Sequence, residues 1–456
     1  MALSKFQIAK SPALILVFGF AIIIVMGALL LGLPAASPAG QPPIGLFNAF
    51  FTSTSATCVI GMSTIDIGSG LSLFGQIVVL ILIQLGGIGI MTMTSFIYLI
   101  MGKRITLSER MILSYSFSQS PLQGVVRMTR HVALITAVAE GFGIALFCIR
   151  LIPMYGAARG FYYSVYQSVS AFCNVGFDVF GQSTNMIPFA DDVLINVVTM
   201  LLVVIGGLGF FVVSELFTKV ARRSKKRLSL HTKMVLVMTA GLIAGGFVVF
   251  LISEWNNPLT LGAPHLKPHE KVMGALFQSV NARSAGFYTV DQSHLQPLSI
   301  MATIGLMFIG ASPSGTGGGI KTTTIALFVL FIVSILRGKE DVEVAKRRLN
   351  RNLVLRAVAI TTLGIAFVLV MCSTIYVIEQ GRFSLDNISF EVIAAFGTTG
   401  LTTGVTAMLS VPSLVLMMLT MFGGRVGIFT FAMALSYRLE KTRKDIRYPE
   451  DKILIG

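Results

Sequence analysis

The sequence predicts an all-α polytopic membrane protein made of four concatenated repeats, and three observations support this fold class. The 456 residues are 54% hydrophobic and only 12% charged, whereas soluble domains carry about 25% charged residues. Eight apolar runs are long enough to cross the roughly 30 Å hydrocarbon layer of a bilayer. One short pattern ending in glycine occurs four times, at Gly61, Gly176, Gly286 and Gly400, with spacings of 115, 110 and 114 residues.

The apolar runs are expected to be membrane-spanning helices. In chain order they are 12–33, 71–100, 132–152, 193–217, 234–252, 298–336, 354–378 and 412–437. The first is longer than a signal-peptide core and lacks a cleavage pattern at a suitable distance, so we expect it to remain as a helix. The sixth is too long for one simple span.

Charge sets the expected orientation. Lys and Arg cluster in segments that alternate with the glycine-bearing ones, namely 103–130, 219–233, 337–356 and 438–452. The positive-inside rule therefore places these segments and both termini in the cytoplasm and the glycines outside. The net charge of +15 then reflects topology, and we expect no nucleic-acid partner, although the run 222–227 also suits an anionic lipid surface.

The outer segments are acidic. Their carboxylates are Asp66, Asp178, Asp191, Asp192, Glu254, Glu270, Asp291, Glu379 and Asp386. These groups either concentrate cations at the outer face or form an ordinary rim that the positive-inside rule leaves poor in basic residues.

A short amphipathic stretch precedes each glycine, at 44–56, 161–172, 271–282 and 386–396. Such stretches are too short to span the bilayer and indicate re-entrant helices that line water or protein. A half-helix entering from outside directs its negative C-terminal end toward the centre, which favours a cation there. The sequence thus predicts helix–pore-helix–helix repeats around a pseudo-fourfold pore.

The strips after the short helices are the candidate ion filter, because glycine lets the backbone turn its carbonyl groups inward. The residues expected to line it are Thr57, Val59, Ile60, Gly61, Asn174, Val175, Gly176, Ser284, Ala285, Gly286, Thr398, Thr399 and Gly400. The other interpretation, that glycines only allow helices to pack closely, suits the Gly-Gly pairs at 86–87, 206–207 and 423–424.

The repeats have expected boundaries. They are 1–102 (pore loop 44–66), 103–220 (pore loop 161–180), 221–338 (pore loop 271–291) and 339–440 (pore loop 386–404), followed by a cytoplasmic tail at 441–456.

The third repeat contains a second helix that must break at 310–324, where one proline and several glycines interrupt an apolar run. A mobile loop there would lie across the pathway beneath the filter. The candidate gate comprises Ser312, Pro313, Ser314, Gly315, Thr316, Gly317, Gly318, Gly319, Lys321 and Arg425. The glycines and Lys321 resemble a phosphate-binding loop, but Ile320 separates the last glycine from the lysine and the flanks are apolar helix.

Three further ionisable residues lie in apolar segments. Arg425 either faces the pore as a positive barrier or pairs with a carboxylate or loop carbonyl and fixes the gate. Arg283 is expected to point away from the ion path and brace the filter, against Glu391. Glu140 is either a structural group or part of proton coupling.

These features resemble the Trk/Ktr/HKT superfamily of potassium transporters, and most closely the bacterial Ktr membrane (pore) subunit. The resemblance rests on 168–177, 281–287, the broken helix 310–324 and Arg425, and it covers essentially the whole chain. It implies K⁺ as the substrate, with Na⁺ as a second cation, and no covalent cofactor. It also implies the bacterial inner membrane, a homodimer and a cytoplasmic RCK-type ring that carries the regulatory nucleotide.

Glycine in all four strips, including Gly61, goes with potassium preference in that superfamily. The alternatives are a sodium-preferring or non-selective cation channel and, more remotely, an ATP-hydrolysing membrane enzyme. No phosphorylatable Asp motif or Walker pair in the sequence supports an enzyme. The third strip is one residue shorter than the second, which leaves the number of ion sites open.

Overall fold

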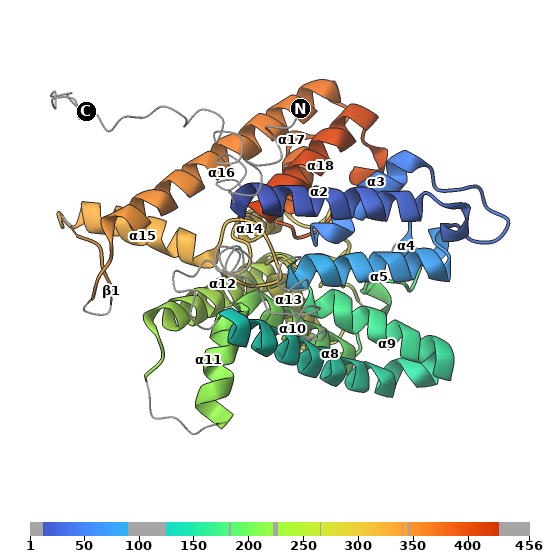
Figure 1. The fold of residues 1–456 in the computed structure, drawn as a ribbon, viewed down its shortest axis with the longest axis horizontal. Coiled ribbons are helices and arrows are strands. Elements are labelled where there is room, and N and C mark those ends of the chain that lie inside the picture. Colours follow the sequence, from blue (N-terminus) through green and yellow to red (C-terminus); the bar gives the residue numbers. More distant parts are fainter. Residues whose placement is uncertain are drawn as a thin grey trace.

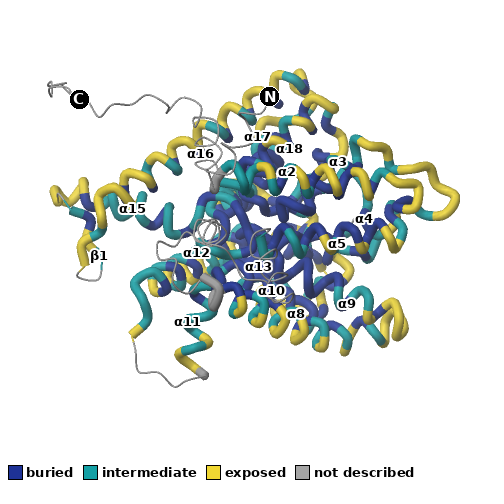
Figure 2. The backbone as a smooth tube through the Cα atoms, viewed as in Figure 1, coloured by how far each residue is buried: buried dark blue, intermediate teal, exposed yellow. Residues whose placement is uncertain are grey.

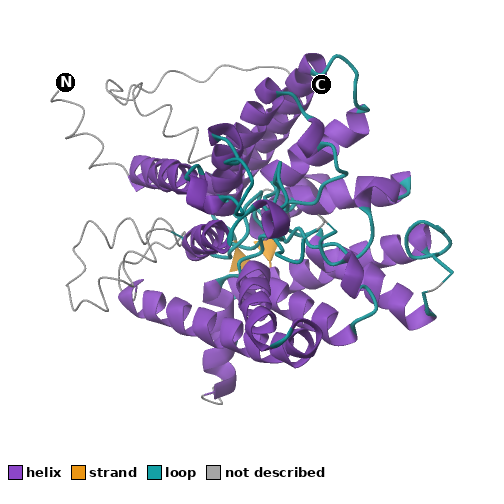
Figure 3. Ribbon diagram, turned by 90° about the vertical axis from the view of Figure 1, so that its right-hand side faces the viewer, coloured by secondary structure: helices purple, strands orange, loops and turns teal. Residues whose placement is uncertain are grey.

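The computed structural model describes residues 12–89, 125–181, 184–221, 227–264, 266–339, 341–344 and 347–427. Within this part, regular structure is helical apart from the two-stranded hairpin of β1 (Glu343–Val344) and β2 (Arg347–Arg348). The colours of Figure 1 follow the chain and show each quarter of the sequence in its own sector, with α8 and α9 below and α16 to α18 above. Figure 3 shows loop segments converging at the centre of the helices.

Four long apolar helices begin the successive units: α2 (Pro12–Leu31), α8 (Val125–Tyr155), α12 (Leu230–Glu254) and α16 (Arg351–Ile378). Among the described residues, these are the helices that are long and apolar enough by themselves to cross a membrane, and a bent pair of helices makes a fifth candidate. Each exposes large apolar side chains on its outer face, such as Ile22, Val138, Ile252 and Leu369. Figure 2 shows exposed residues at the periphery and buried ones in the centre, as expected for a protein whose outer solvent is lipid.

Short helices follow the long ones: α3 (Leu46–Thr57), α9 (Ala157–Phe172), α13 (Pro268–Asn281) and α17 (Leu385–Phe396). The last turns of each are buried. In the first three units a serine of the short helix donates to a carbonyl of the long helix, where a nearby glycine leaves room for it. These bonds are Ser53 to Ile24 (2.7 Å), Ser168 to Glu140 (2.8 Å) and Ser279 to Ile243 (2.7 Å).

The second helices of the units are α5 (Leu73–Ile88), α10 (Val193–Leu208), α14 (Pro297–Phe308) and α18 (Val411–Val426). The sequence predicts single spans over 71–100, 193–217 and 412–437, and for 193–217 this prediction is wrong. Helix α10 ends at Gly209, and the chain bends by 105° into α11 (Phe210–Ala221). Helices α5 and α18 likewise end at Gly89 and Gly427, while 90–100 and 428–437 lie outside the described residues.

The reason for these breaks is conformational. Gly89, Gly209 and Gly427 have φ of 87° to 90°, which only glycine adopts without strain. Interruption is therefore not peculiar to the third unit. There, α14 and α15 (Thr322–Leu336) are separated by residues 309–321, whose ends meet in a parallel bridge between Ile309 and Ile320. The broken helix predicted at 310–324 is present.

The outer segments hold short elements: η1 (Pro34–Ala36), α4 (Ile67–Gly70), η2 (Ile187–Phe189), η3 (Gln292–His294) and η4 (Thr406–Met408). Several outer carboxylates cap these and the second helices. Asp66 accepts from Gly68 N at 2.8 Å, and Asp192 accepts from Ile195 N while pairing with Arg150 at 2.6 Å. Part of the outer acidity therefore stabilises helix starts.

Candidate ion pathway

The four glycines of the repeated pattern form a closed ring. A Cβ atom added to any of them would lie within 2.6 Å of the carbonyl oxygen that precedes the next glycine in chain order. The distances from the added Cβ to that oxygen are 1.9 Å for Gly61 and Val175 O, 2.6 Å for Gly176 and Ala285 O, 2.4 Å for Gly286 and Thr399 O, and 1.8 Å for Gly400 and Ile60 O. Since the fourth strip returns to the first, the strips surround one axis, and strips two and four lie on opposite sides of it.

The strips share an unusual backbone conformation. Each glycine has φ between 75° and 93°, and the residue two positions before it also has positive φ, between 50° and 69°. The latter residues are Val59, Asn174, Ser284 and Thr398. Positive φ is rare outside glycine and for Val is a true outlier, of the kind that proteins retain at functional sites. The repetition in all four strips shows that the tertiary structure imposes it.

Backbone hydrogen bonds hold each strip against its short helix. The residue before the glycine donates to a carbonyl five positions back in three strips: Ile60 to Ser55, Val175 to Ser170 and Thr399 to Ala394, at 2.9 to 3.0 Å. In the third strip Ala285 N reaches only four positions back, to Asn281 O at 3.1 Å. The third strip is thus one residue tighter, so the ring is only approximately fourfold.

The side-chain hydroxyl groups of the strips differ in whether they form hydrogen bonds. Ser284 Oγ donates to Thr398 O at 3.0 Å and lies 3.2 Å from Thr398 Oγ1, so it joins strips three and four. Thr57 Oγ1 and Thr399 Oγ1 are buried with no hydrogen-bond partner among the described residues. The backbone carbonyl groups are therefore the ligand type common to all four strips.

The segment 309–321 crosses beneath the ring. Thr316 Oγ1 donates to Asn174 Oδ1 of strip two at 3.1 Å, and Gly318 N donates to Thr398 Oγ1 of strip four at 2.6 Å. Between these two contacts, Gly317 lies against strip three, where an added Cβ would be 2.3 Å from Ser284 Oγ. The segment therefore contacts strips two, three and four.

The broken second helices supply the carbonyl groups that hold the segment. The last turn of a helix leaves carbonyl oxygens without intrahelical partners. Ser312 N and Thr316 N donate to Gly207 O and Gly206 O of α10, at 3.0 and 3.2 Å. Gly319 N donates to Gly424 O of α18 at 3.2 Å. The helix ends at these glycines therefore provide hydrogen-bond acceptors for the segment, which is a role beyond close packing.

The Gly-Gly pairs also pack closely, as the alternative interpretation of the sequence predicts. A Cβ at Gly86, Gly206 or Gly424 would lie 2.0 to 2.2 Å from a carbonyl oxygen at the end of a short helix. These carbonyl groups belong to Thr57, Phe172 and Phe396. Helices α5, α10 and α18 thus lie directly against the base of a strip.

Arg425 connects the segment to the first unit. Its guanidinium donates to Thr316 O and to Gly86 O, and more distantly to Gly87 O at 3.4 Å. Of the alternatives from the sequence, pairing with a loop carbonyl is the one observed. Lys321 Nζ donates to the neighbouring Gly317 O at 2.7 Å. Two cationic side chains therefore bind adjacent carbonyl groups of the segment.

The predicted contact between Arg283 and Glu391 is wrong. In the described part of the chain no ion pair joins them. Glu391 instead accepts from Thr402, Thr403 and Thr406 in the segment after strip four. Arg283 is buried, and its Nε has no hydrogen-bond partner among the described residues. The hydroxyl groups near Glu391 satisfy its lone pairs without a cation.

Glu391 belongs to a set of braces that sequence reasoning missed. Each short helix has a polar residue nine positions before the glycine, or eight in the tighter third strip, that bonds to the segment after the strip. The pairs are Thr52 with Ser63 (3.5 Å), Gln167 with Met186 (3.4 Å), Gln278 with Gln292 (2.6 Å) and Glu391 with Thr402 (2.8 Å). Alignment of the four repeats on their glycines would have revealed this position.

Glu140 has a polar partner in the neighbouring unit. Gln84 Nε2 of α5 donates to both of its carboxyl oxygens, at 2.9 and 3.1 Å. Cys173 Sγ, at the base of strip two, lies 3.4 Å from Gln84 Oε1. Glu140 therefore joins units one and two, in agreement with the structural alternative.

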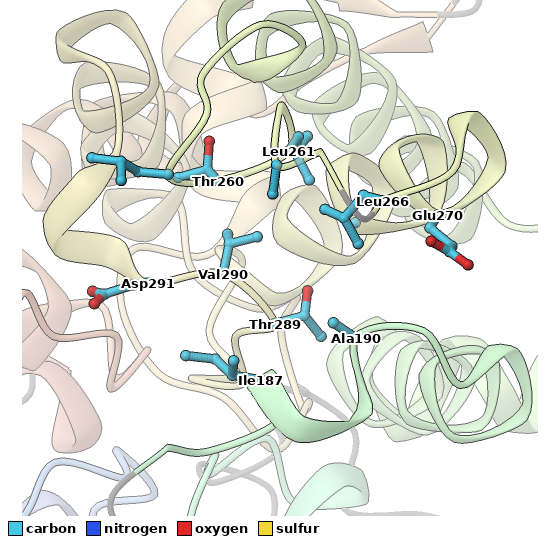
Figure 4. A pocket seen from close by; sticks show the side chains of 12 residues that line it. Ile187, Ala190, Thr260, Leu261, Leu266, Glu270, Thr289, Val290 and Asp291 are labelled. Carbon is cyan, nitrogen blue, oxygen red and sulfur yellow. The ribbon is translucent and has the colours of Figure 1, made fainter.

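The outer mouth includes Asp178, two residues after Gly176. Burial raises the pKa of this carboxyl group to about 7, against the opposing hydrogen bond from Phe180 N and with a smaller contribution from Asp66. Beside the mouth, a cavity of about 190 Å³ lies between the outer segments of units two and three, and its lining includes Thr289, Glu270 and Asp291 (Figure 4). None of the ring glycines lines this cavity.

Comparison with known proteins agrees with this architecture. The family model described as TrkH, cation transport protein, matches residues 11–444. The Ktr system potassium uptake protein B of Bacillus subtilis (strain 168) is 34% identical, and the potassium/sodium uptake protein NtpJ of Enterococcus hirae is 32% identical; both alignments cover 100% of both chains. The crystal structure of the potassium transporter TrkH from Vibrio parahaemolyticus superposes with a TM-score of 0.69 at 18% identity, covering 95% of this chain and 86% of that one. The chain therefore belongs to the TrkH family of cation transport proteins.

Proposed function

We propose that the chain carries K⁺ into the cell across the bacterial inner membrane, through a filter made by the strips that contain Gly61, Gly176, Gly286 and Gly400. The observation that carries this proposal is the closed ring of four glycines, each packed against the next strip's carbonyl group. Rings of backbone carbonyl groups replace the hydration shell of K⁺ in selective channels. The C-terminal ends of the four short helices point toward these strips, and their partial negative charge favours a cation.

Potassium is the preferred ion in this proposal, with Na⁺ as the competing or coupled cation. Glycine occupies the key position of the first strip, Gly61, as it does in the other three. The names of two full-length relatives also support potassium, one describing potassium uptake and the other potassium/sodium uptake. A sodium-preferring channel remains the outcome that ion competition must test.

The segment Ser312–Gly319 with Lys321 is the proposed gate, and Arg425 is its anchor. Support comes from the hydrogen bonds that hold this segment across the inner end of the ring, between strips two and four. Opening requires these bonds and the contacts of Arg425 to break. A loop that rests on helix-end carbonyl groups can be released without unfolding a helix.

Regulation would come from the cytoplasm. We place both termini and the basic segments 103–130, 219–233, 337–356 and 438–452 on that side, following the charge distribution and the positive-inside rule. The proposed assembly is a homodimer on an RCK-type ring that binds the nucleotide, consistent with the name "Ktr system" of a relative. The four proposed repeats are 1–102, 103–220, 221–338 and 339–440.

The test is uptake of radioactive rubidium, a potassium substitute, into liposomes that contain only this purified chain. Uptake down a gradient without ATP is expected, with competition by external K⁺ stronger than by Na⁺. Strict dependence on ATP would overturn the proposal in favour of an ATP-hydrolysing enzyme. Stronger competition by Na⁺ would overturn the potassium assignment, and uptake with and without Na⁺ at zero voltage separates passive from coupled transport.

A further inference from the structure

We propose that Asn185 is a positioning residue of the filter, which fixes strip two at Gly176 and thereby contributes to the discrimination of K⁺ against Na⁺. Asn185 lies in the outer segment of unit two, nine residues after Gly176. This inference rests on the proposed function, because it takes the strips around the four glycines as the filter. It adds a side chain outside the strips that holds one of their carbonyl groups.

The side chain of Asn185 connects strip two with the segment that follows strip three. Its Nδ2 donates to Gly176 O at 2.9 Å, and its Oδ1 accepts from Tyr288 N at 3.2 Å. Both partners are backbone groups of fixed polarity, so they determine which end of the amide carries the oxygen. A backbone hydrogen bond from Met186 N to Tyr288 O, at 3.1 Å, joins the same two segments. The amide of Asn185 is therefore held at both ends.

The surroundings of Asn185 favour one conformation of this amide. The residue is only 7% exposed, and a buried amide that lost its partners would leave polar groups unsatisfied, which is costly. Its φ is 49°, a left-handed conformation that asparagine adopts more readily than most other residues. Burial and backbone conformation thus both support the arrangement in which Nδ2 bonds to Gly176 O.

This donor breaks the fourfold symmetry of the ring. The residues nine positions after the other ring glycines lack a side-chain donor; they are Gly70, Leu295 and Leu409. The next carbonyl group of strip two is also held by a side chain, because Ser170 Oγ donates to Phe177 O at 2.7 Å. Side chains therefore hold two consecutive carbonyl groups of strip two, those of Gly176 and Phe177.

A strip that is held in this way affects ion choice through distance. Na⁺ is smaller than K⁺, so a ring of backbone oxygens must contract to bind it as closely. Contraction at strip two would move Gly176 away from the Asn185 amide and would lose part of a buried hydrogen bond. The geometry and number of the carbonyl groups decide between these two ions in selective channels. The bond from Asn185 should therefore disfavour Na⁺ more than K⁺.

The test is the variant Asn185→Gly. It removes both hydrogen bonds of the side chain and keeps the backbone conformation, because glycine adopts positive φ without strain. We expect Na⁺ to compete better for rubidium uptake and K⁺ to compete about as before, so that the ratio of the two inhibition constants falls roughly fivefold, the equivalent of about one hydrogen bond. The measurement is the initial rate of rubidium uptake into liposomes that contain the purified full chain, with KCl or NaCl outside. A loss of folded protein lowers the rate but leaves this ratio unchanged.

The matched control is Asn196→Ala. The Asn196 amide is also buried and donates to backbone carbonyl groups of the same outer segment, Phe189 O at 2.9 Å and Ala190 O at 3.2 Å. Its loss weakens this segment without removing the bond to Gly176, so the ratio should stay at the wild-type value. Should Asn185→Gly fail to fold, Asn185→Asp assayed at pH 8 takes its place. As a carboxylate this side chain keeps an oxygen for Tyr288 N and has no donor for Gly176 O, so the ratio should fall again.

The inference is overturned when a folded Asn185 variant keeps the wild-type ratio, or when Asn196→Ala lowers the ratio as much as Asn185→Gly does. Failure of the proposed function would look different, because the wild-type chain would then show no rubidium uptake, or competition by Na⁺ at least as strong as by K⁺. A wild-type preference for K⁺ with an unchanged ratio in the Asn185 variants would reject only the role of Asn185.

Discussion

The ring of strips and the segment directly beneath it differ in symmetry. In the ring all four units contribute the same part, a glycine with positive φ that contacts the next strip's carbonyl group. Beneath it, within the part of the chain that the structure describes, the third unit alone contributes a crossing segment, while the others offer helix-end carbonyl groups or Arg425. Coordination of an ion on an axis benefits from symmetry. Closure of that axis needs one segment, and four would not fit at one point.

The difference shows how a repeated chain produces a unique gate. In units one, two and four Gly89, Gly209 or Gly427 follows the second helix, and carbonyl groups of its last turn accept hydrogen bonds from the segment 309–321 or from Arg425. In the third unit residues 309–321 separate α14 from α15, and backbone N–H groups of this segment donate to carbonyl groups of α10 and α18. Repetition thus provides the acceptors, while the irregular third unit supplies backbone donors and Arg425 of the fourth unit supplies the side-chain donor.

The largest effect should follow from a methyl group in the ring. Gly400→Ala places a Cβ 1.8 Å from Ile60 O, so strip four must move and rubidium uptake should fall to the background of empty liposomes. Gly404→Ala is the matched control. Gly404 also has positive φ, 88°, but a Cβ there meets nothing within 4 Å. An equal loss of uptake in the two variants would show that backbone strain, and not the contact between strips, causes the loss.

Shortening the segment 309–321, which only one unit contributes among the described residues, should have the next largest effect. Deletion of residues 314–318 takes away Thr316 and Gly318, the two donors that bond the segment to strips two and four. When the open state is a minor one, populated at about 10% or less, uptake should rise roughly tenfold or more. The measurement is the initial rate of rubidium uptake per folded protein. An unchanged rate in a well-folded deletion variant would contradict the assignment of the gate.

A smaller change in the ring should alter selectivity. Gly61→Ser introduces a side chain 1.9 Å from Val175 O, so the carbonyl groups of strips one and two must shift. We expect discrimination of K⁺ against Na⁺ to weaken by roughly fivefold, about 1 kcal/mol. Competition of rubidium uptake by each cation gives the ratio. An unchanged ratio would show that the first strip does not contribute to selection.

The smallest expected effect is a dependence on external pH. Because burial raises the pKa of Asp178 to about 7, this carboxyl group is mostly neutral at pH 6 and mostly charged at pH 8. Uptake at low rubidium concentration should therefore increase by roughly twofold over this interval, since negative charge at the mouth attracts cations. Asp178→Asn should remove the increase, and a persistent increase in that variant would exclude Asp178 as its source.

Much of the fold could be predicted from local patterns. Apolar length indicated the long helices, and the repeated glycine located the short ones to within a few residues, for example 386–396 against Leu385–Phe396. The break at 310–324 followed from Pro313 and its glycines. The bend at Gly209 was not predicted, because the glycines at 206, 207 and 209 were interpreted as small residues that let a continuous helix pack closely.

The candidate site was only partly accessible from the sequence. Spacing alone could select the four glycines, and a lone charge in an apolar helix could select Arg425. Pairing was harder, because Arg283 and Glu391 have opposite charges yet Glu391 binds three threonines instead. Composition gives no measure of which hydroxyl groups the chain brings to a buried carboxylate.

By itself, the sequence determined the class of protein, the fourfold repetition and the residue types of the strips, because hydropathy, helix length and the need for glycine are local properties. Only the tertiary structure decided that the strips close into a ring in chain order and that strips two and four hold the segment beneath them. Contacts such as Gly400 with Ile60 and Thr316 with Asn174 join residues more than a hundred positions apart. They arise only when all four units pack around one axis, which no local pattern encodes.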